Sequence, residues 1–256
     1  MHELEAVYTV WLREMIRYTR DRGRMISSLA MPIFWLLIFG SSIRASVEMN
    51  IDYTSFIAPG IIVMSLMFNS IFSGITVIWD RELGFMKEML VAPISRLSIV
   101  AGKALGGATT ALVQGTFLIF LILVVKNLSS GYFIALRMDL TVFFLIIPMM
   151  VLISLGLVGL GISIASRLDS LENFGLVMNF LIMPMFFLSG ALFPINNLPS
   201  WIRYVTYLDP VTYGVELLRS ILIGFSSINI ILSFSAVLIF TCSMLLIGAY
   251  LFNKRS

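Results

Sequence analysis

Six long stretches without a charged residue dominate the pattern of hydrophobic and polar positions in this chain. They cover residues 25–43, 55–79, 104–125, 140–166, 173–192 and 228–252. Each approaches or exceeds the ~20 residues that a helix needs to cross a bilayer. Lipid offers the backbone no hydrogen-bonding partners, so each stretch is predicted to be helical. The pattern predicts an all-α integral membrane protein with six transmembrane helices, folded as a single transmembrane domain over residues 1–256.

The composition narrows the class of protein further. Hydrophobic residues make up 59% of the chain and charged residues 12%, about half the charged share of an average soluble protein. The formal net charge of +3 resides in the loops and one terminal helix, which argues against a nucleic-acid partner. Cys242 lies within the sixth stretch and is the only cysteine, so no intrachain disulfide is expected.

The loops predict how the chain is oriented in the membrane. The two ends and one set of loops hold Arg13, Arg17, Arg20, Arg22, Arg24, Arg81, Lys87, Arg96, Lys103, Arg167, Lys254 and Arg255. The other set of loops holds Arg44, Lys126, Arg137, Arg203 and Arg219. Short cytoplasmic loops collect Lys and Arg, so both termini are predicted to lie in the cytoplasm. The loops over 46–54 and 193–227 are then predicted to face outward.

The first 24 residues predict an amphipathic helix that lies along the membrane surface. Over residues 4–24, apolar side chains fall on one face and arginines lie nearly opposite. The apolar face holds Leu4, Val7, Tyr8, Trp11, Met15 and Tyr18, and the basic face holds Arg13, Arg17, Arg20 and Arg24. Such a helix directs its arginines toward anionic head groups. We interpret residues 1–24 as an elbow helix in contact with membrane lipid, and a generic topogenic anchor is a compatible alternative.

The connection over residues 80–96 is the only sizeable cytoplasmic loop between the predicted spans. Leu83, Met86 and Leu90 recur at helical spacing and Pro93 ends the segment, which predicts a short charged helix. Glu82 is expected at the start of this helix, where its carboxylate would face the positive end of the helix dipole. The segment is either a docking surface for a soluble partner or a solvated connector whose charges only fix the topology.

Residues 193–227 form a different kind of connection on the opposite side. They contain Pro194, Pro199, Pro210, Trp201, Tyr204, Tyr207 and Tyr213. Pro199 suits the first turn of a short helix, and Asp209-Pro210 predicts an N-cap followed by a first-turn proline. Trp and Tyr favour the head-group level of a membrane. The segment is therefore predicted to fold as paired short helices at, or partly within, the outer leaflet.

Three polar residues within the spans are candidates for lining a translocation path. They are Asn69, Gln114 and Asn179, and each is alternatively explained by an ordinary hydrogen bond between helices. Close helix contacts are predicted at the small-xxx-small pair Gly102 and Gly106 and at Gly156, Gly159 and Gly161 of the fourth span.

Several chemistries are missing from the sequence. No Asp, Glu, Lys, Arg or His lies near the middle of a predicted span, where ion-coupled carriers place their relays. We find no cluster of metal ligands and no catalytic dyad. Gly102-Lys103 is not a phosphate-binding loop, because Leu97 and Ala104 replace the glycine and the Ser/Thr that such a loop needs. The chain is predicted to be neither an enzyme nor a nucleotide-binding protein, so energy for active transport must come from another chain.

Two stretches resemble the permease subunits of ABC-2-type exporters, and the resemblance covers nearly the whole length. The first contains Asp80-Arg81-Glu82, Gly84, Glu88, Leu90, Ala92-Pro93-Ile94-Ser95-Arg96 and Gly102-Lys103. The second contains Phe187-Leu188-Ser189-Gly190, Phe193-Pro194, Leu198-Pro199, Leu208-Asp209-Pro210 and the stretch from Tyr213 to Arg219. Phe85 departs from the threonine that is usual after Gly84. Within the family, the chain looks most similar to the small drug-export permeases.

The resemblance implies a set of partners and site residues. The chain would be half of a transmembrane domain in the cell membrane, paired with a second permease copy, as a homodimer or a heterodimer, and with two separate ABC ATPase subunits that bind ATP and Mg. The coupling helix would use Arg81, Glu82, Gly84, Phe85, Met86, Glu88, Leu90 and Pro93, helped by Trp11, Arg13, Arg17 and Arg20 of the elbow helix. Phe193, Pro194, Pro199, Asp209 and Pro210 would shape the outer gate.

Two other classes of function fit the same spans. A secondary transporter or channel would transport its substrate in liposomes that lack an ATPase. A scaffold or membrane-anchoring subunit would show no substrate-dependent stimulation of a partner ATPase. For an exporter, a path of apolar residues and amides suits a hydrophobic or amphipathic substrate such as a drug, a lipid or a lipid-linked glycan.

Overall fold

The computed structural model describes residues 2–42, 53–128, 136–137 and 139–255. Within these ranges every regular element is a helix. The elements are α1 (His2–Arg20), α2 (Arg22–Ser42), α3 (Tyr53–Ser73), α4 (Ile75–Glu82), α5 (Phe85–Val91), α6 (Arg96–Leu128), α7 (Leu140–Ala165), α8 (Leu171–Leu188), the 3-10 helix η1 (Ile195–Asn197), α9 (Ser200–Leu208), α10 (Pro210–Ile223) and α11 (Ile230–Arg255). The loop expected to face outward over residues 46–54 lies mostly outside the described residues.

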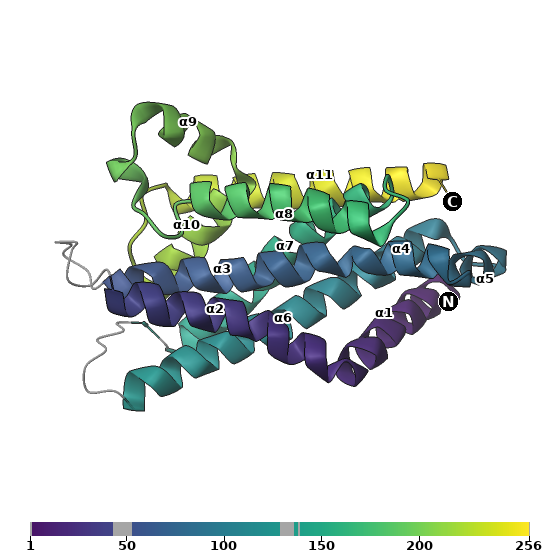
Figure 1. Ribbon diagram of the computed structural model, residues 1–256, viewed down its shortest axis with the longest axis horizontal. Coiled ribbons are helices and arrows are strands. Elements are labelled where there is room, and N and C mark those ends of the chain that lie inside the picture. The colour runs from purple at the N-terminus through teal and green to yellow at the C-terminus, as the bar shows by residue number, and fades with distance from the viewer. Residues whose placement is uncertain (1, 43–52, 129–135, 138, 256) are drawn as a thin grey trace.

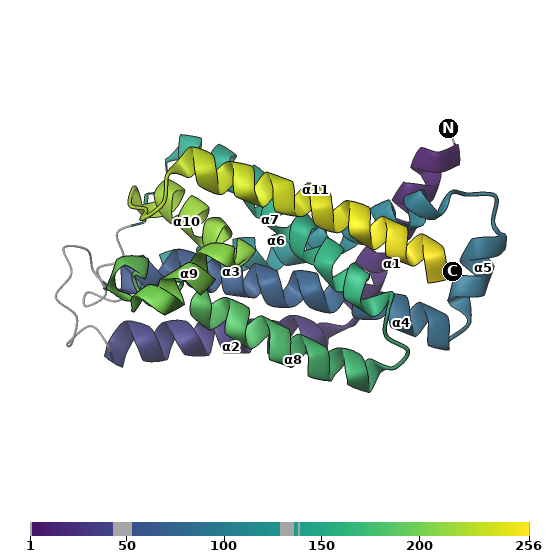
Figure 2. The same ribbon diagram turned by 90° about the horizontal axis from the view of Figure 1, so that it is seen from above.

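The helices form an elongated bundle with two distinct ends (Figure 1). Both chain termini and α5 lie at one end, which we call the α5 end, and α9 and α10 lie at the other, which we call the α9 end. The view from above shows α2, α3, α8 and α11 running lengthwise between the two ends (Figure 2). Placement of α5 and both termini at one end agrees with the predicted alternation of the spans.

Five described helices are long and apolar enough to cross a membrane. They are Tyr53–Glu82, which joins α3 and α4, Arg96–Val124, Leu140–Ala165, Leu171–Leu188 and Ile230–Lys254. In α2, the apolar stretch found among the described residues is the shorter Met25–Ile38. The chain is therefore a multi-pass membrane protein.

Several boundaries differ from those predicted by hydropathy. The first helix ends at Arg20, and α2 starts at Arg22, so the N-terminal helix is shorter than residues 1–24. α6 begins at Arg96, eight residues before the predicted span, because its first turns pack inside the protein and not in lipid. α8 ends at Leu188, before residue 192, and Gly190 follows with a φ of +72°, a left-handed conformation that glycine adopts without strain.

Glycines allow the helices to approach closely where the sequence predicted it. A Cβ on Gly161 of α7 would lie 2.4 Å from the carbonyl oxygen of Ile71 in α3. Gly74, at the break between α3 and α4, faces Gly161 in turn, with a Cβ placed 2.5 Å from its carbonyl carbon. Gly159 faces the backbone of α11 in the same way, 2.9 Å from Leu245 N. The predicted close contacts of the fourth span are thus confirmed.

Candidate functional site

Asp80 is a buried carboxylate near the C-terminal end of α4 at which three helices meet. A buried charge is costly unless it is paired and hydrogen-bonded. Arg13 Nη2 of α1 and Lys103 Nζ of α6 both donate to Asp80, and Arg17 Nη1 of α1 lies 3.7 Å from Asp80 Oδ1. Asp80 itself has no exposed surface. Its charge is therefore neutralised only if α1, α4 and α6 stay together.

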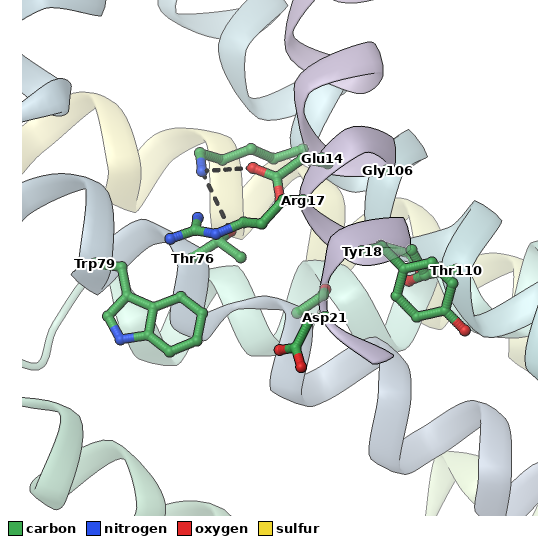
Figure 3. A pocket seen from close by; sticks show the side chains of 11 residues that line it. Glu14, Arg17, Tyr18, Asp21, Thr76, Trp79, Gly106 and Thr110 are labelled. Carbon is green, nitrogen blue, oxygen red and sulfur yellow. Dashed lines mark hydrogen bonds and ion pairs between the residues drawn. The ribbon is translucent and has the colours of Figure 1, made fainter. Parts of the chain in front are cut away.

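Lys103 completes this arrangement with a second carboxylate. Its ammonium group also lies 3.3 Å from Glu14 Oε1 of α1 and 3.2 Å from Thr76 Oγ1 of α4, and the side chain is almost fully buried. Three acceptors match the three N–H groups of an ammonium. Figure 3 shows Glu14 and Thr76 converging from the two helices. We call the five charged side chains, Arg13, Glu14, Arg17, Asp80 and Lys103, the Asp80 junction.

Two glycines on α6 bring α1 close enough for these contacts. A Cβ on Gly102 would lie 2.6 Å from Val10 Cβ, and one on Gly106 would lie 2.7 Å from Glu14 Cβ. No larger residue fits at either position without moving α1. The predicted small-xxx-small contact is confirmed, and its partner is the N-terminal helix.

The short helix α5 is attached to this junction through Arg13. Gly84, with a φ of +81°, turns the chain between α4 and α5. The Arg13 guanidinium lies 5.3 Å from the centroid of the Phe85 ring, and Arg13 Nη1 lies 3.4 Å from Met89 Sδ. Met86 is buried on the same helix. Arg13 thus links α5 to the buried end of α4.

Two further contacts tie the α5 loop to the rest of the α5 end. Arg81 Nη1 donates to the carbonyl of Leu168, in the α7–α8 connection, at 3.2 Å. The Glu3 carboxylate accepts hydrogen bonds from Ser95 N and Ser95 Oγ, the latter at 2.7 Å, and from Ser98 Oγ at the start of α6. The hydrogen bonds from Ser98 and Ser95 lower the pKa of Glu3 below its ordinary value, and the bond from Ser98 contributes most.

Two expectations about the α5 loop are wrong. Glu82 is the last residue of α4 and not the first of the next helix, so its exposed carboxylate lies at the negative end of a helix dipole. Leu83 is 63% exposed and does not share the buried face of Met86. Leu90 lies in α5, and Glu88 and Pro93 are exposed.

The basic face of the N-terminal helix also differs from the expectation. Arg13 and Arg17 face the Asp80 junction, although head groups were the predicted partners. Only Arg20 among the three elbow arginines is exposed. Trp11 Nε1 donates to Thr109 Oγ1 of α6 at 3.1 Å, so this ring packs against protein. The buried pairing of Asp80 accounts for the change, since an unpaired carboxylate inside the bundle would be far more costly.

The three path candidates do not converge. Asn69 lines an apolar cavity of about 290 Å³ between α2 and the α3–α4 pair, and its Nδ2 donates to the Ser65 carbonyl at 3.0 Å. Gln114 is buried and donates from Nε2 to Ser28 Oγ at 2.6 Å. Asn179 is exposed on α8. Of the three candidates, Asn69 is the one that lines this cavity.

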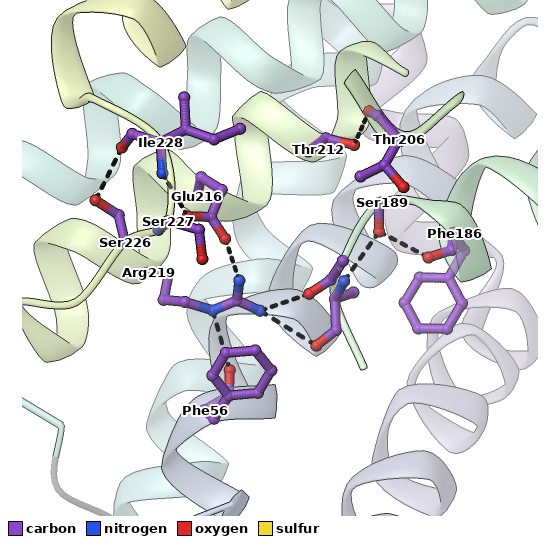
Figure 4. Close-up of polar contacts among 12 residues, drawn as sticks. Phe56, Phe186, Ser189, Thr206, Thr212, Glu216, Arg219, Ser226, Ser227 and Ile228 are labelled. Carbon is purple, nitrogen blue, oxygen red and sulfur yellow. Dashed lines mark hydrogen bonds and ion pairs between the residues drawn. The ribbon is translucent and has the colours of Figure 1, made fainter. Parts of the chain in front are cut away.

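At the α9 end, a buried ion pair holds several segments together (Figure 4). Arg219 and Glu216 of α10 pair with no exposed surface on either side chain. Arg219 also donates to the carbonyls of Phe56 at 3.3 Å, Gly190 at 2.9 Å and Ala191 at 3.3 Å. Its guanidinium carbon lies 3.9 Å from the centroid of the Phe56 ring. α10 is thus bonded to α3 and to the segment that follows α8.

The second carboxylate oxygen of Glu216 extends this cluster. It accepts hydrogen bonds from the backbone amides of Ser227 and, at 3.3 Å, Ile228. These residues lead into α11. The predicted outer helices therefore exist, but α10 is packed into the bundle and not laid on a membrane surface, as nine of its fourteen residues are buried.

The outer-gate candidates lie around the start of these helices. Phe193 is 44% exposed, Pro194 precedes η1, and Pro199 is the N-cap of α9, one position before its first turn. Asp209 caps α10 by accepting from Val211 N at 2.9 Å, and Pro210 is the first residue of that helix, as predicted. Burial raises the pKa of Asp209 to about 7, although the hydrogen bond from the Val211 amide acts in the opposite direction.

The sequence of α10 contains a signal for the buried pair. Glu216 and Arg219 stand three residues apart within an apolar stripe, and opposite charges at this spacing are neighbours on a helix. Hydropathy places Lys103 and Asp80 in loops, because both residues lie just beyond the apolar stretches. Nothing in the spacing along the chain indicates that Asp80, Lys103 and Glu14 meet.

The geometry defines a class of protein. It is a multi-pass helical membrane protein with a buried charge junction at one end and a short helix attached to that junction. Over residues 5–223 the sequence matches the family described as ABC-2 type transporter. The chain belongs to the ABC-2 type transporter family.

Several relatives share most of their length with this chain. It is 29% identical to ycf38 of Cyanophora paradoxa, whose name describes a transport permease, over 98% of this chain and 89% of that protein. It is 26% identical to nodulation protein J of Rhizobium leguminosarum bv. viciae, over 96% of this chain and 93% of that protein. It is also 26% identical to the inner membrane transport permease YadH of Escherichia coli K12, over 94% and 92%. The chain is accordingly a membrane permease of an ABC transporter.

Proposed function

We propose that this chain is half of the transmembrane pathway of an ATP-driven exporter in the cell membrane. Counting α2, it supplies six spans, and the α5 end faces the cytoplasm with both termini. The excess of basic residues in the loops and termini assigned to the α5 end supports this orientation. A second permease copy completes the pathway.

Two separate ABC ATPase subunits drive the cycle, and ATP and Mg bind to them and not to this chain. We propose that α5 is the coupling helix on which these subunits act. One observation carries this proposal: the Asp80 junction joins α5, through Arg13, to α1, α4 and α6. A push on α5 is therefore transmitted to two membrane-spanning helices through buried charge pairs that are costly to break.

The substrate is proposed to be hydrophobic or amphipathic. The cavity beside Asn69 is lined by Met31, Phe68, Phe72 and Trp79 together with small polar side chains. Such a lining suits an apolar body and at most a few hydrogen-bonding groups. Asn69 is the buried polar residue of this lining, so its amide offers the substrate a hydrogen-bonding group inside the protein.

A reconstitution experiment tests the coupling role. The permease and its co-purifying ATPase are placed in proteoliposomes, and ATP hydrolysis and substrate export are measured for wild type, Arg13→Gln and the control Lys254→Gln. Lys254 is an exposed charge at the α5 end. We expect Arg13→Gln to lower export at least tenfold per ATP hydrolysed while Lys254→Gln does not.

Two outcomes contradict the proposal. If Arg13→Gln inserts and folds normally and exports as wild type, α5 does not act through the Asp80 junction. If the permease alone transports at the full rate without an ATPase, the protein is a secondary transporter or channel. Glu82→Ala is a second probe of docking, since Glu82 is exposed and next to α5, and we expect it to weaken co-purification of the ATPase with normal expression.

A further inference from the structure

Arg17 is the member of the Asp80 junction whose hydrogen-bonding capacity is left unused. Its guanidinium carries five N–H donors, yet the side chain makes no hydrogen bond with any described residue. It is held 4.6 Å above the Trp79 ring, and its closest charged neighbour is Asp80 Oδ1 at 3.7 Å. Nη1 is buried without an acceptor. The Arg17 side chain is 31% exposed, so its remaining N–H donors are accessible to an anionic oxygen ligand.

The surroundings of Arg17 have room for such a ligand. Arg17 lines a groove of about 530 Å³ together with Arg13, Arg20, Asp21, Ile16 and Phe85. Arg20 is exposed and has no charged partner among the described residues. Arg13 is already bonded to Asp80. The two arginines with capacity for a ligand are therefore Arg17 and Arg20, three positions apart on one face of α1.

The location of the groove selects the source of the anion. It lies between the C-terminal half of α1 and Phe85 of α5, and it reaches Asp21, which joins α1 to α2 four positions before the apolar stretch Met25–Ile38. Its apolar walls, Ile16 and Phe85, are each more than 40% exposed. The Trp79 ring beneath Arg17 also forms a wall of the apolar cavity between α2 and α4. Figure 3 shows a neighbouring pocket, in which Arg17 and Tyr18 of α1 and the following Asp21 lie near Trp79 of α4.

We infer that this groove binds an anionic phospholipid, whose phosphate bridges Arg17 and Arg20 and whose acyl chains follow the adjacent apolar surface. The planar fork of a guanidinium matches a phosphate with two parallel hydrogen bonds. Basic side chains next to a span attract anionic lipid. Because Arg17 also faces Asp80, the bound phosphate adjoins the charges that connect α1 to α4. The inference does not depend on the proposed export activity.

The test uses the purified full-length permease without an ATPase. Native mass spectrometry measures the dissociation constants of phosphatidylglycerol and phosphatidylcholine, and thermal unfolding is followed with inorganic phosphate as a third probe. We expect phosphatidylglycerol to bind at least fivefold more tightly than phosphatidylcholine. Arg17→Gln and Arg20→Gln should each raise the dissociation constant of phosphatidylglycerol about fivefold. The control Lys254→Gln should leave this constant unchanged.

Each contrary result overturns a stated part of the inference. Equal binding of the two lipids shows that the groove does not select an anion. Stabilisation by inorganic phosphate to the same degree as by phosphatidylglycerol shows that a free anion, and not a lipid, is the ligand. If Arg20→Gln binds phosphatidylglycerol as tightly as wild type does, the lipid does not bind at the assigned site. If Arg17→Gln fails to fold because it disturbs Asp80, the result for Arg20→Gln decides the test, since Arg20 is exposed.

Discussion

Replacing Lys103 by methionine tests whether the Asp80 junction holds α1 to the bundle. The substitution keeps the apolar stem and removes the ammonium, so Glu14 loses its 3.3 Å partner and Asp80 loses one of its two donors. At that distance and an effective dielectric constant of ~20, the attraction to Glu14 alone amounts to about 5 kcal/mol before desolvation is subtracted. Removing one partner of a buried pair usually costs about 3–5 kcal/mol, because the remaining charge is stranded.

The assay is thermal unfolding of the purified permease in one detergent at pH 7. A loss of about 3–5 kcal/mol corresponds to a fall in Tm of roughly 6–20 °C for a chain of this size. Lys87→Met, an exposed lysine on α5, is the matched control and should leave Tm unchanged. Adding Glu14→Gln to Lys103→Met should restore part of the loss, because the stranded carboxylate is then neutral.

One result would refute this reasoning. If Lys103→Met unfolds within about 2 °C of wild type and the double variant is no more stable than the single one, Lys103 is not a buried charge partner in the membrane-embedded protein. The joint stability of α1, α4 and α6 would then rest on apolar packing.

Three other predictions concern packing, pH and topology. Gly102→Ala should lower Tm, by an overpacking cost of about 1–3 kcal/mol, while the control Gly175→Ala, where a Cβ meets nothing within 4 Å, should not. Because burial raises the folded-state pKa of Asp209 from 3.8 to about 7, stability should fall as the pH rises through this window, by at most about 4 kcal/mol. Asp209→Asn should keep the cap, remove this dependence in thermal melts and be more stable than wild type at pH 8. Single cysteines at positions 95 and 197 in a cysteine-free background should differ in labelling by an impermeant maleimide on intact cells. Only the cysteine that replaces Asn197 should be labelled. Labelling only of the cysteine that replaces Ser95 would show that the orientation is reversed.

Hydropathy located the membrane-crossing helices because lipid imposes one constraint on every span, a continuous apolar surface. Hydropathy did not predict where the helices end. The first two turns of α6 and the last two turns of α4 carry charged residues inside the protein, where Lys103 and Asp80 neutralise each other. A rule based on transfer to lipid assigns such residues to loops.

The same limit applies to the candidate site. Arg13 and Arg17 were correctly placed on one face of a helix, but their partner Asp80 is more than sixty positions away along the chain. The prediction that Glu82 starts the short helix is wrong because α5 begins at Phe85, after the left-handed Gly84. The spacing of Leu83, Met86 and Leu90 predicts a start two residues earlier. Helical spacing reports which side chains share a face and carries no information about what that face meets.

The buried pair in α10 has a consequence for how the protein assembles in the membrane. Arg219 and Glu216 are neutral as a pair, but their remaining hydrogen bonds come from α3, from the chain after α8 and from the residues before α11. If any of these segments is missing, α10 must leave polar groups unpaired in an apolar interior, which costs several kcal/mol. α10 therefore completes its docking only after Ser227 and Ile228, just before the last helix, are in place. The α9 end of the bundle should consequently form in a single cooperative step late in biogenesis, and a chain truncated before Ser227 should leave α10 open to proteolysis.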